Sequence, residues 1–346
     1  MGALSSRFDG RLVLNTMDAA VKNFALALAP VRDSLNLLDE HLPLFVESSV
    51  PEVQKLLAEV LEGIGKKIRP AFFFLSCRLC DYNGEHKMAM AAVMEFVHTA
   101  SLLHDDVLDN SPLRRNRPTL HTRHGAVSAI LVGDLIYARA SEMMTETGSL
   151  EIVHILARAI RLMSEAELLQ LQHVFDMQMP FERYIAVLEG KTASLLGASC
   201  RSAAILAGKD TQQRVALEQF GFNIGLAFQL LDDALDYTAE AAQFGKKPFS
   251  DLKEGRMTLP LLKIIEHATA AEKALLKTSL QDPKNFEDCV ALLTTLSHQY
   301  GAVQFTLELA DSYTAKAIAI LKTNFPDSPA RQQLEALSLS LLVRPY

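Results

Sequence analysis

Two short acidic motifs are the residues of this 346-residue chain best suited to chemistry. They place aspartates at positions i, i+1 and i+4, namely Asp105, Asp106 and Asp109 in the first motif and Asp232, Asp233 and Asp236 in the second. If the flanks are helical, the first and last aspartate of each motif project from one face, about one turn apart. Carboxylates that face one another repel, and Mg²⁺ bound by carboxylate and phosphate oxygens relieves that repulsion. The motifs therefore predict two walls of a cavity that binds a diphosphate through magnesium.

The residues around the motifs decide between this interpretation and a solvated helix face, which is the usual role of a single Asp-Asp-x-x-Asp run. Apolar residues flank the first motif at 102–103 and 107–108, and the second at 230–231 and 234–235. A solvated face would carry further charged residues instead. The apolar surroundings favour the cavity.

Cationic residues form several clusters, and those on the loops beyond the two motifs lie close to them in sequence. They are Lys66, Lys67 and Arg69 near a helix start, Arg114, Arg115 and Arg117 after the first motif, Lys191 beside Thr192, and Lys246, Lys247 and Lys253 beyond the second motif. Any one cluster could be a solvated surface patch. Cations beside acidic groups on both loops indicate instead that a metal and a diphosphate lie between them. His98, seven residues before Asp105, lies on the same helix face about two turns away and is predicted to reach a second diphosphate.

The composition excludes several classes of protein. A formal charge of −7 argues against nucleic acid as a partner. The chain has no run of 18 or more uncharged apolar residues, because Asp134 interrupts the longest candidate, so we expect no transmembrane segment. The N-terminus does not resemble a secretory signal, and the four cysteines, including Cys77 and Cys80, are interpreted as reduced thiols. These features predict a cytoplasmic protein.

Apolar residues recur with the helical period of 3.6 along almost the whole chain, and strand alternation is nearly absent. The expected helices cover residues 16–42, 51–62, 69–82, 85–109, 125–147, 149–177, 181–207, 211–237, 258–281, 284–299, 302–324 and 328–343. Gly and Pro residues mark the joints, and no linker divides the chain. The prediction is an all-α protein in which residues 1–346 form a single-domain helical bundle with a central cavity.

With these motifs in place, the chain resembles the trans-isoprenyl diphosphate synthases (polyprenyl synthetases), and within them the long-chain octaprenyl diphosphate synthases. The matching segments, in family order, are Gly65–Pro70, His98–Asp109, Arg114–Arg115, Val132–Asp134, Gly190–Thr192, Phe228–Asp233 and Glu254–Pro260. The resemblance covers nearly the whole chain and implies the isoprenoid synthase fold. At Ser250 the chain departs from relatives that often carry an acidic residue there.

The resemblance implies a role for each matching residue. The metal ligands would be Asp105, Asp109, Asp232 and Asp236, which hold three Mg²⁺ with support from Asp106 and Asp233. The allylic diphosphate would contact Arg114, Lys191, Thr192, Gln229 and Lys246. Isopentenyl diphosphate would bind to Lys66, Arg69, His98 and Arg115. The groups implied to be catalytic are the aspartates Asp105, Asp106, Asp109, Asp232 and Asp233, together with Arg114 and Lys191.

The implied reaction is ionisation of the allylic diphosphate followed by attack of isopentenyl diphosphate on the allylic cation. The residues offer no obvious general base, so the released diphosphate is expected to take the proton. Product length would be set near Ala100 and Ser101, the fifth and fourth residues before the first motif, where an aromatic residue would block the growing tail. Both are small here, and a helical turn rises about 5.4 Å, close to one isoprene unit. We therefore expect an all-trans product near C40 for a quinone side chain.

Other functions stay open at this point. One is a shorter-chain farnesyl or geranylgeranyl diphosphate synthase. A class I terpene cyclase is less favoured because it would replace the second acidic motif and would not need the site around Lys66, Arg69 and His98. An inactive partner subunit of a heteromeric enzyme would be expected to have lost an acidic motif. A di-iron carboxylate bundle would rely on Glu-x-x-His pairs as its metal ligands instead of two Asp-Asp-x-x-Asp motifs.

The sequence also predicts how the chain assembles. The helices expected at 85–109 and 125–147 are apolar over more than one face, which is more than one bundle core requires. We therefore expect a homodimer that buries this surface. A transient contact with a membrane would accompany release of a long apolar product.

Overall fold

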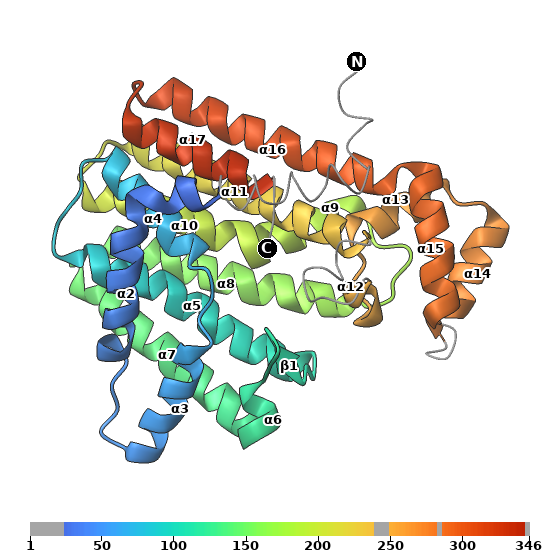
Figure 1. The fold of residues 1–346 in the computed structure, drawn as a ribbon, viewed down its shortest axis with the longest axis horizontal. Helices are drawn as coiled ribbons and strands as arrows, with labels where there is room; N and C mark the ends of the chain where they lie inside the picture. The colour runs from blue at the N-terminus through green and yellow to red at the C-terminus, as the bar shows by residue number, and fades with distance from the viewer. Residues whose placement is uncertain (1–23, 239–248, 282–285, 343–346) are drawn as a thin grey trace.

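The computed structural model describes residues 24–238, 249–281 and 286–342, and in these residues the protein is almost entirely helical (Figure 1). The α-helices are α2 (Arg32–Phe45), α3 (Pro51–Glu62), α4 (Ile68–Leu79), α5 (His86–Leu108), α6 (Leu120–His124), α7 (Ala126–Glu146), α8 (Leu150–Gln172), α9 (Phe181–Leu188), α10 (Ser194–Leu206), α11 (Thr211–Asp236), α12 (Ser250–Lys253), α13 (Leu259–His267), α14 (Ala270–Gln281), α15 (Phe286–Tyr300), α16 (Ala302–Asn324) and α17 (Pro329–Leu342). A 3₁₀ turn, η1 (Ala29–Val31), precedes α2, and a π-helical segment, η2 (Glu189–Ala193), joins α9 to α10. The predicted all-α fold is confirmed.

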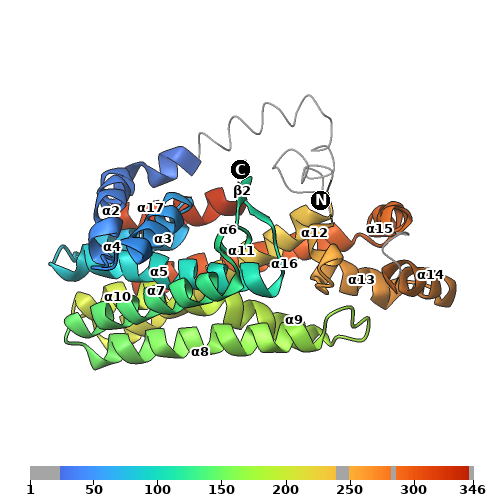
Figure 2. The same cartoon turned by 90° about the horizontal axis from the view of Figure 1, so that it is seen from below.

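The long helices form a bundle whose central members include α5, α10 and α11 (Figure 1), while α8 runs along its lower edge in Figure 2. Helix α11 packs against α10 on one side and α16 on the other, and α7 packs along α5. The pair α14 and α15 lies at one end of the molecule, beyond α13 (Figure 1). Helices α5 and α11, which carry the two acidic motifs, are both central members of this bundle.

Local sequence signals fix where several helices begin. The Ser149 side chain accepts a hydrogen bond from the backbone N–H of Ile152 at the start of α8, and Asp210 accepts one from Gln213 at the start of α11. These caps satisfy amide groups that have no partner within the helix. Pro51 opens α3, where its missing N–H costs nothing.

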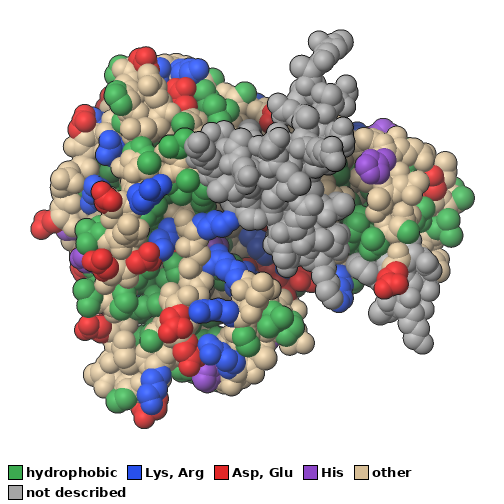
Figure 3. All heavy atoms as spheres, in the orientation of Figure 1, with side chains coloured by type: hydrophobic (Ala, Val, Ile, Leu, Met, Phe, Trp, Pro, Cys, Tyr) green, Lys and Arg blue, Asp and Glu red, His purple; other side chains and the backbone are tan. Residues whose placement is uncertain are grey.

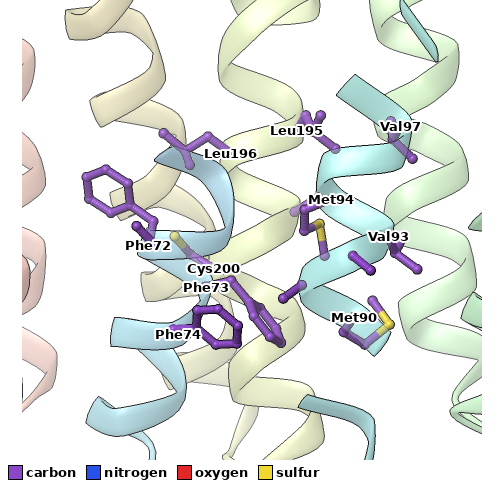
Figure 4. Packing of buried hydrophobic residues seen from close by; sticks show 14 of the residues in the cluster. Phe72, Phe73, Phe74, Met90, Val93, Met94, Val97, Leu195, Leu196 and Cys200 are labelled. Carbon is purple, nitrogen blue, oxygen red and sulfur yellow. The ribbon is translucent and has the colours of Figure 1, made fainter. Parts of the chain in front are cut away.

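A dense apolar core holds α4, α5 and α10 together (Figure 4). Phe72, Phe73 and Phe74 on α4 are fully buried, and so are Met90 and Met94 on α5. Burial of each such side chain contributes about 1.5–3 kcal/mol relative to leaving it exposed. This core fixes the N-terminal part of α5. The first acidic motif lies at the C-terminal end of the same helix.

The structure differs from the expected helix boundaries in a few places. The helix expected over 258–281 is broken at Ala268, whose extended backbone (φ −63°, ψ 142°) separates α13 from α14. The segment expected as a helix over 181–207 contains the π-helical insertion η2. Two residues on each side of a tight turn, Leu113–Arg114 and Arg117–Pro118, pair as the antiparallel strands β1 and β2.

A helix that crosses a bilayer needs about 20 predominantly apolar residues. Within the described ranges, no helix is long and apolar enough to do so.

Candidate active site

A cavity of about 750 Å³ opens between α5, α8, η2, α10 and α11. Its wall combines the two acidic motifs with the cations that the sequence placed near them. The sequence-predicted site residues on this wall are Lys66, Arg69, His98, Ser101, Asp105, Arg114, Arg115, Lys191, Thr192, Gln229, Asp232 and Asp236. Lys and Arg side chains also gather near the middle of the face shown in Figure 3. Segments up to 170 residues apart in the chain thus meet at one site.

The first acidic motif sends its aspartates in different directions. Asp105 lines the cavity, and burial raises its pKa to about 6, with the neighbouring carboxylate of Glu167 adding to the effect. Asp106 is only 4% exposed and accepts a 2.7 Å hydrogen bond from Nε of Arg114. This ion pair fixes Arg114 on the cavity wall, so Asp106 acts through its partner.

In the second motif, Asp232 and Asp236 line the cavity, while Asp233 points away from it toward α9. Asp236 accepts hydrogen bonds from the backbone N–H groups of Ser250 and Asp251, each 3.1 Å long. The Ser250 hydroxyl donates a further bond of 2.8 Å to Asp236. Ser250, where similar sequences often carry an acidic residue, therefore holds the Asp236 carboxylate directly.

Asp109 caps the C-terminus of α5 and pairs with Arg256 at 2.5 Å. Arg256 also binds Asp251 at 3.1 Å and Glu254 at 2.5 Å. These carboxylates raise its pKa, so the guanidinium stays charged. Arg256 thereby links the end of the first motif to the loop that follows the second one.

The π-helical segment η2 carries Lys191 and Thr192 into the cavity. Single π turns within helices are rare and are frequently found at functional sites. A Cβ at Gly190 would lie 2.5 Å from the carbonyl oxygen of Leu162, so only glycine allows this segment to lie so close to α8. Lys191 Nζ pairs with Glu167 and lies 3.8 Å from Asp105. The Thr192 hydroxyl donates a 2.9 Å hydrogen bond to Oε1 of Gln229.

A second, strongly cationic part of the cavity is formed by α4, α5 and the β1–β2 turn. Arg69 and His98 are withdrawn from bulk water, which lowers the pKa of Arg69 to about 10 and that of His98 well below its usual value. The neighbouring cations Arg69, Arg115 and Arg114 depress the His98 pKa further. Glu95, 4% exposed, is the carboxylate that offsets this charge. The arrangement attracts an anion such as a diphosphate.

The β1–β2 turn explains how Arg115 reaches this pocket. Arg115 and Asn116 both have left-handed backbone (φ 52° and 61°), as a tight two-residue hairpin requires. The guanidinium of Arg115 donates a 2.8 Å hydrogen bond to the carbonyl of Gly63 and lies against Gly65, where a Cβ would come within 2.2 Å of it. Gly65 is therefore needed for the close approach of Arg115.

Some of the sequence-predicted residues that the structure describes lie off the cavity wall. Ala100 is fully buried in the hydrophobic core next to the wall, whereas its neighbour Ser101 lies on the wall itself. Lys246 lies outside the described residues. Asp106 and Asp233 hold the wall residues Arg114 and Gln229, whereas the side chain of Asp109 pairs with Arg256 and does not line the wall.

Several residues that sequence reasoning did not single out belong to the site. Glu95, Glu167 and Tyr137 line the cavity, and Arg256 links the two acidic motifs. The signal for Glu95 is a lone charge in an otherwise apolar stretch, three residues before His98. Glu167 stands out less, because the sequence around it on α8 carries other glutamates at Glu165 and Glu151.

The donors of this site suit Mg²⁺ only when other ligands complete its shell. Within the part of the chain that the structure describes, no three His, Cys, Asp or Glu side chains converge closely enough to hold a metal ion by themselves. Asp105, Asp232 and Asp236 nevertheless present carboxylate oxygens to one cavity beside cations that suit phosphate. Such donors fit a hard cation held by one or two carboxylates, waters and substrate phosphates.

Comparison with known proteins agrees with this geometry. Residues 50–296 match the family model described as polyprenyl synthetase. The chain belongs to the polyprenyl synthetase family. It is a trans-prenyltransferase, an all-trans polyprenyl diphosphate synthase with a long-chain product, as the sequence predicted.

Individual relatives are similar over most of their length. The octaprenyl diphosphate synthase of Escherichia coli K12 is 37% identical over 293 residues, which cover 85% of this chain and 90% of that protein. The all-trans-nonaprenyl-diphosphate synthase (geranyl-diphosphate specific) of Rhodobacter capsulatus is 33% identical over 92% of this chain and 97% of its own. A solved polyprenyl synthase from Caulobacter crescentus, complexed with calcium and isoprenyl diphosphate, is 34% identical and superimposes with a TM-score of 0.85, covering 94% of this chain and 98% of that one.

Proposed function

We propose that the enzyme adds isopentenyl diphosphate units to an allylic diphosphate and makes a product near C40 that serves as a quinone side chain. The observation that carries this proposal is the division of one cavity into two anion sites. One site lies between the acidic motifs, and the other is the cationic pocket around Arg69 and His98. A condensation of two diphosphates needs both sites, whereas a cyclase needs only one.

The allylic diphosphate binds between the acidic motifs in this proposal. Asp105, Asp109, Asp232 and Asp236 hold three Mg²⁺, which neutralise the diphosphate as it leaves. Asp109 exchanges its pairing with Arg256 for this role. Arg114, Lys191, Thr192, Gln229 and Lys246 contact the same diphosphate, with Asp106 and Asp233 as supports. The Thr192 hydroxyl donates its hydrogen bond to Gln229, so its oxygen lone pairs remain available toward the cavity, where positive charge develops.

Isopentenyl diphosphate binds in the cationic pocket through Lys66, Arg69, His98 and Arg115. This pocket and the acidic walls open into the same cavity, so the two substrates lie side by side. The carbon–oxygen bond of the allylic diphosphate breaks, the C3–C4 double bond of isopentenyl diphosphate attacks the resulting cation, and a proton leaves C2 for the released diphosphate. The protein contributes position, charge and exclusion of water.

The growing tail leaves the metals along α5 and passes Ser101. Tyr137 from α7 and Met163 from α8 also line the cavity. The small side chain of Ser101 on the wall lets the tail extend in this proposal. Relatives named as octaprenyl and nonaprenyl diphosphate synthases support a long product, and we propose a length near C40.

We further propose that the enzyme is a cytoplasmic homodimer in which residues 1–346 form one domain. The outer face of α7 exposes Val127 (71%), Ile130 (40%), Leu131 (60%) and Leu135 (38%). Four apolar side chains on one helix face are typical of a surface that another protein covers. Release of the apolar product brings this dimer briefly into contact with a membrane.

The test is incubation of the purified enzyme with labelled isopentenyl diphosphate, Mg²⁺ and geranyl or farnesyl diphosphate, followed by chromatography of the dephosphorylated products. We expect all-trans alcohols near C40 and no product in excess EDTA. Products that stop at C15 or C20 would refute the chain length alone. Cyclic hydrocarbons formed without isopentenyl diphosphate would refute the condensation.

A further inference from the structure

A chain of hydrogen bonds runs from the buried side of α9 to the wall of the cavity. The Tyr184 hydroxyl donates a 2.6 Å bond to Oδ2 of Asp233. Nε2 of Gln229 donates a 2.9 Å bond to Oδ1 of the same carboxylate. Oε1 of Gln229 in turn accepts the 2.9 Å bond from Thr192. Both oxygens of Asp233 are thus used for positioning other side chains.

We propose that Tyr184 is a positioning residue of the allylic site that acts through Asp233 on Gln229 and Thr192. This inference rests on the function proposed above, because it concerns how the same site is held in shape. Tyr184 itself is 3% exposed and lies behind the second acidic motif, on α9, so it does not touch the substrate.

The bonds fix direction as well as distance. An ionised carboxylate only accepts hydrogen bonds, so in this form Asp233 turns the NH₂ group of Gln229 inward. Burial and the neighbouring Asp251 raise the Asp233 pKa to about 8, and the bonds from Tyr184 and Gln229 oppose that shift. The amide oxygen must then face Thr192, and the threonine proton must point to it. If Asp233 rotated, Gln229 could turn its NH₂ group toward Thr192 and the hydroxyl proton would point into the cavity instead. A cation that forms in the cavity would then face the hydroxyl proton of Thr192 rather than the lone pairs of its oxygen.

Close packing alone does not prevent this rotation. A small cavity of about 70 Å³ lies behind the chain, and Tyr184, Thr192, Gln229 and Asp233 all border it. This space exceeds the volume of about 30 Å³ that one water occupies in the liquid. Side chains next to such a space depend on hydrogen bonds for their orientation, and the Tyr184 hydroxyl provides one of the two that Asp233 receives.

The first acidic motif has a matching arrangement. Its middle aspartate, Asp106, holds Arg114 on the cavity wall, as Asp233 holds Gln229. In both motifs the middle carboxylate therefore orients a side chain that lines the allylic site. Tyr184 adds a further layer to this arrangement in the second motif.

The test compares Tyr184→Phe with Tyr237→Phe, a matched control. Tyr237 is also a buried tyrosine (5% exposed), but its hydroxyl bonds Thr258 and no residue of the acidic motifs. We expect Tyr184→Phe to lower kcat about ten-fold while KM for isopentenyl diphosphate stays within about two-fold of the wild type. The control should keep both constants, and the melting temperatures of the two variants should be similar.

A double-mutant cycle with Thr192→Val distinguishes a shared chain from general damage. If Tyr184 acts through Thr192, adding Tyr184→Phe to Thr192→Val lowers kcat by less than about two-fold more. Independent effects that multiply would overturn the proposal, as would an unchanged kcat for Tyr184→Phe. If Tyr184→Phe fails to fold, Asp233→Asn serves in its place, with the same expected loss in kcat.

A crystal structure of Tyr184→Phe gives a readout that does not depend on turnover. We expect the Gln229 side chain to have moved away from Thr192, and an unchanged chain of bonds would refute the positioning role. If the wild-type enzyme is inactive on both diphosphates, the proposed function is refuted instead. The position of Gln229 in the Tyr184→Phe crystal would still show whether Tyr184 orients it.

Discussion

The carboxylates of the acidic motifs show how residues of one type divide their tasks by direction. Asp105, Asp232 and Asp236 face the cavity, while Asp106 and Asp233 point to protein partners. The i and i+4 positions share a helix face, and the i+1 position is turned about 100° away from it. Of these five, only the cavity-facing three present oxygens directly to a metal and a diphosphate. Asp109, the i+4 residue of the first motif, pairs with Arg256 in this structure.

Removing one of the cavity-facing carboxylates should therefore abolish turnover without unfolding the protein. We expect Asp105→Ala or Asp232→Ala to reduce kcat about a thousand-fold or more, because each variant loses an oxygen ligand for Mg²⁺ on the leaving group. Steady-state kinetics and circular dichroism measure the two properties. Asp327→Ala is the control, since Asp327 pairs with Arg331 in the turn before α17. Near-normal activity of either cavity variant would contradict the metal assignment.

The imidazole of His98, half-buried on the cavity wall, should make stability depend on pH. Burial and neighbouring cations lower its pKa in the folded protein, so below about pH 6.5 the unfolded chain binds a proton that the folded chain does not. The free energy of unfolding should therefore fall as the pH falls through this value, by up to about 1.4 kcal/mol per pH unit.

Urea unfolding of the ligand-free protein between about pH 7.5 and pH 5.5 measures this dependence. His98→Gln should lose that part of the slope, and His298→Gln, which changes an exposed histidine on α15, should keep it. Equal slopes in the wild type and in His98→Gln would show that His98 takes up its proton in the folded state.

At the scale of elements, the direction in which α5 presents each residue decides its effect on the growing tail. Ser101 is on the cavity wall, with its hydroxyl bonded to the carbonyl of His98 at 2.8 Å, whereas Ala100 is turned into the core. Adjacent positions on a helix face about 100° apart, so neighbouring substitutions have different consequences.

Ser101→Phe should place a ring in the tail path about one turn from Asp105 and shorten the product toward C15–C20. Ser101→Ala is the matched control, and its products should keep the wild-type length. Ala100→Phe should instead overpack the core and destabilise the fold by about 1–3 kcal/mol. Chromatography of products and thermal unfolding separate the two effects. Wild-type product length in Ser101→Phe would show that the tail takes another path.

At the scale of the whole molecule, the exposed apolar face of α7 indicates self-association. Helix α7 packs on α5, and α5 carries the first acidic motif, so an interface on α7 would stiffen the wall of the cavity. The expected particle is a dimer of the 38.2 kDa chain.

Light scattering at micromolar concentration should give twice the mass of one chain. Leu131→Glu introduces a charge on the exposed face of α7, which is costly to bury in an interface, and should produce a monomer. Leu275→Glu is the control, because Leu275 is similarly exposed (56%) but lies on α14, at the end of the molecule (Figure 1). A wild-type monomer would contradict the predicted dimer.

The sequence by itself determined the fold class, the two acidic motifs and most of the cations around them. Helical periodicity and the spacing within each motif are local properties, because they depend on residues within about one or two turns of one another. His98 and Asp105 could be placed on one helix face for the same reason.

The tertiary structure decided which of these residues meet, and which partners each one has. The pairing of Asp109 with Arg256, of Lys191 with Glu167 and of Tyr184 with Asp233 joins residues 24 to 147 positions apart. Such contacts depend on how whole helices pack, and no local spacing encodes them. The rotation of Ala100 away from the cavity is of the same kind: α5 is apolar over several faces, so only its packing against α4, α7 and α10 determines which face borders the cavity.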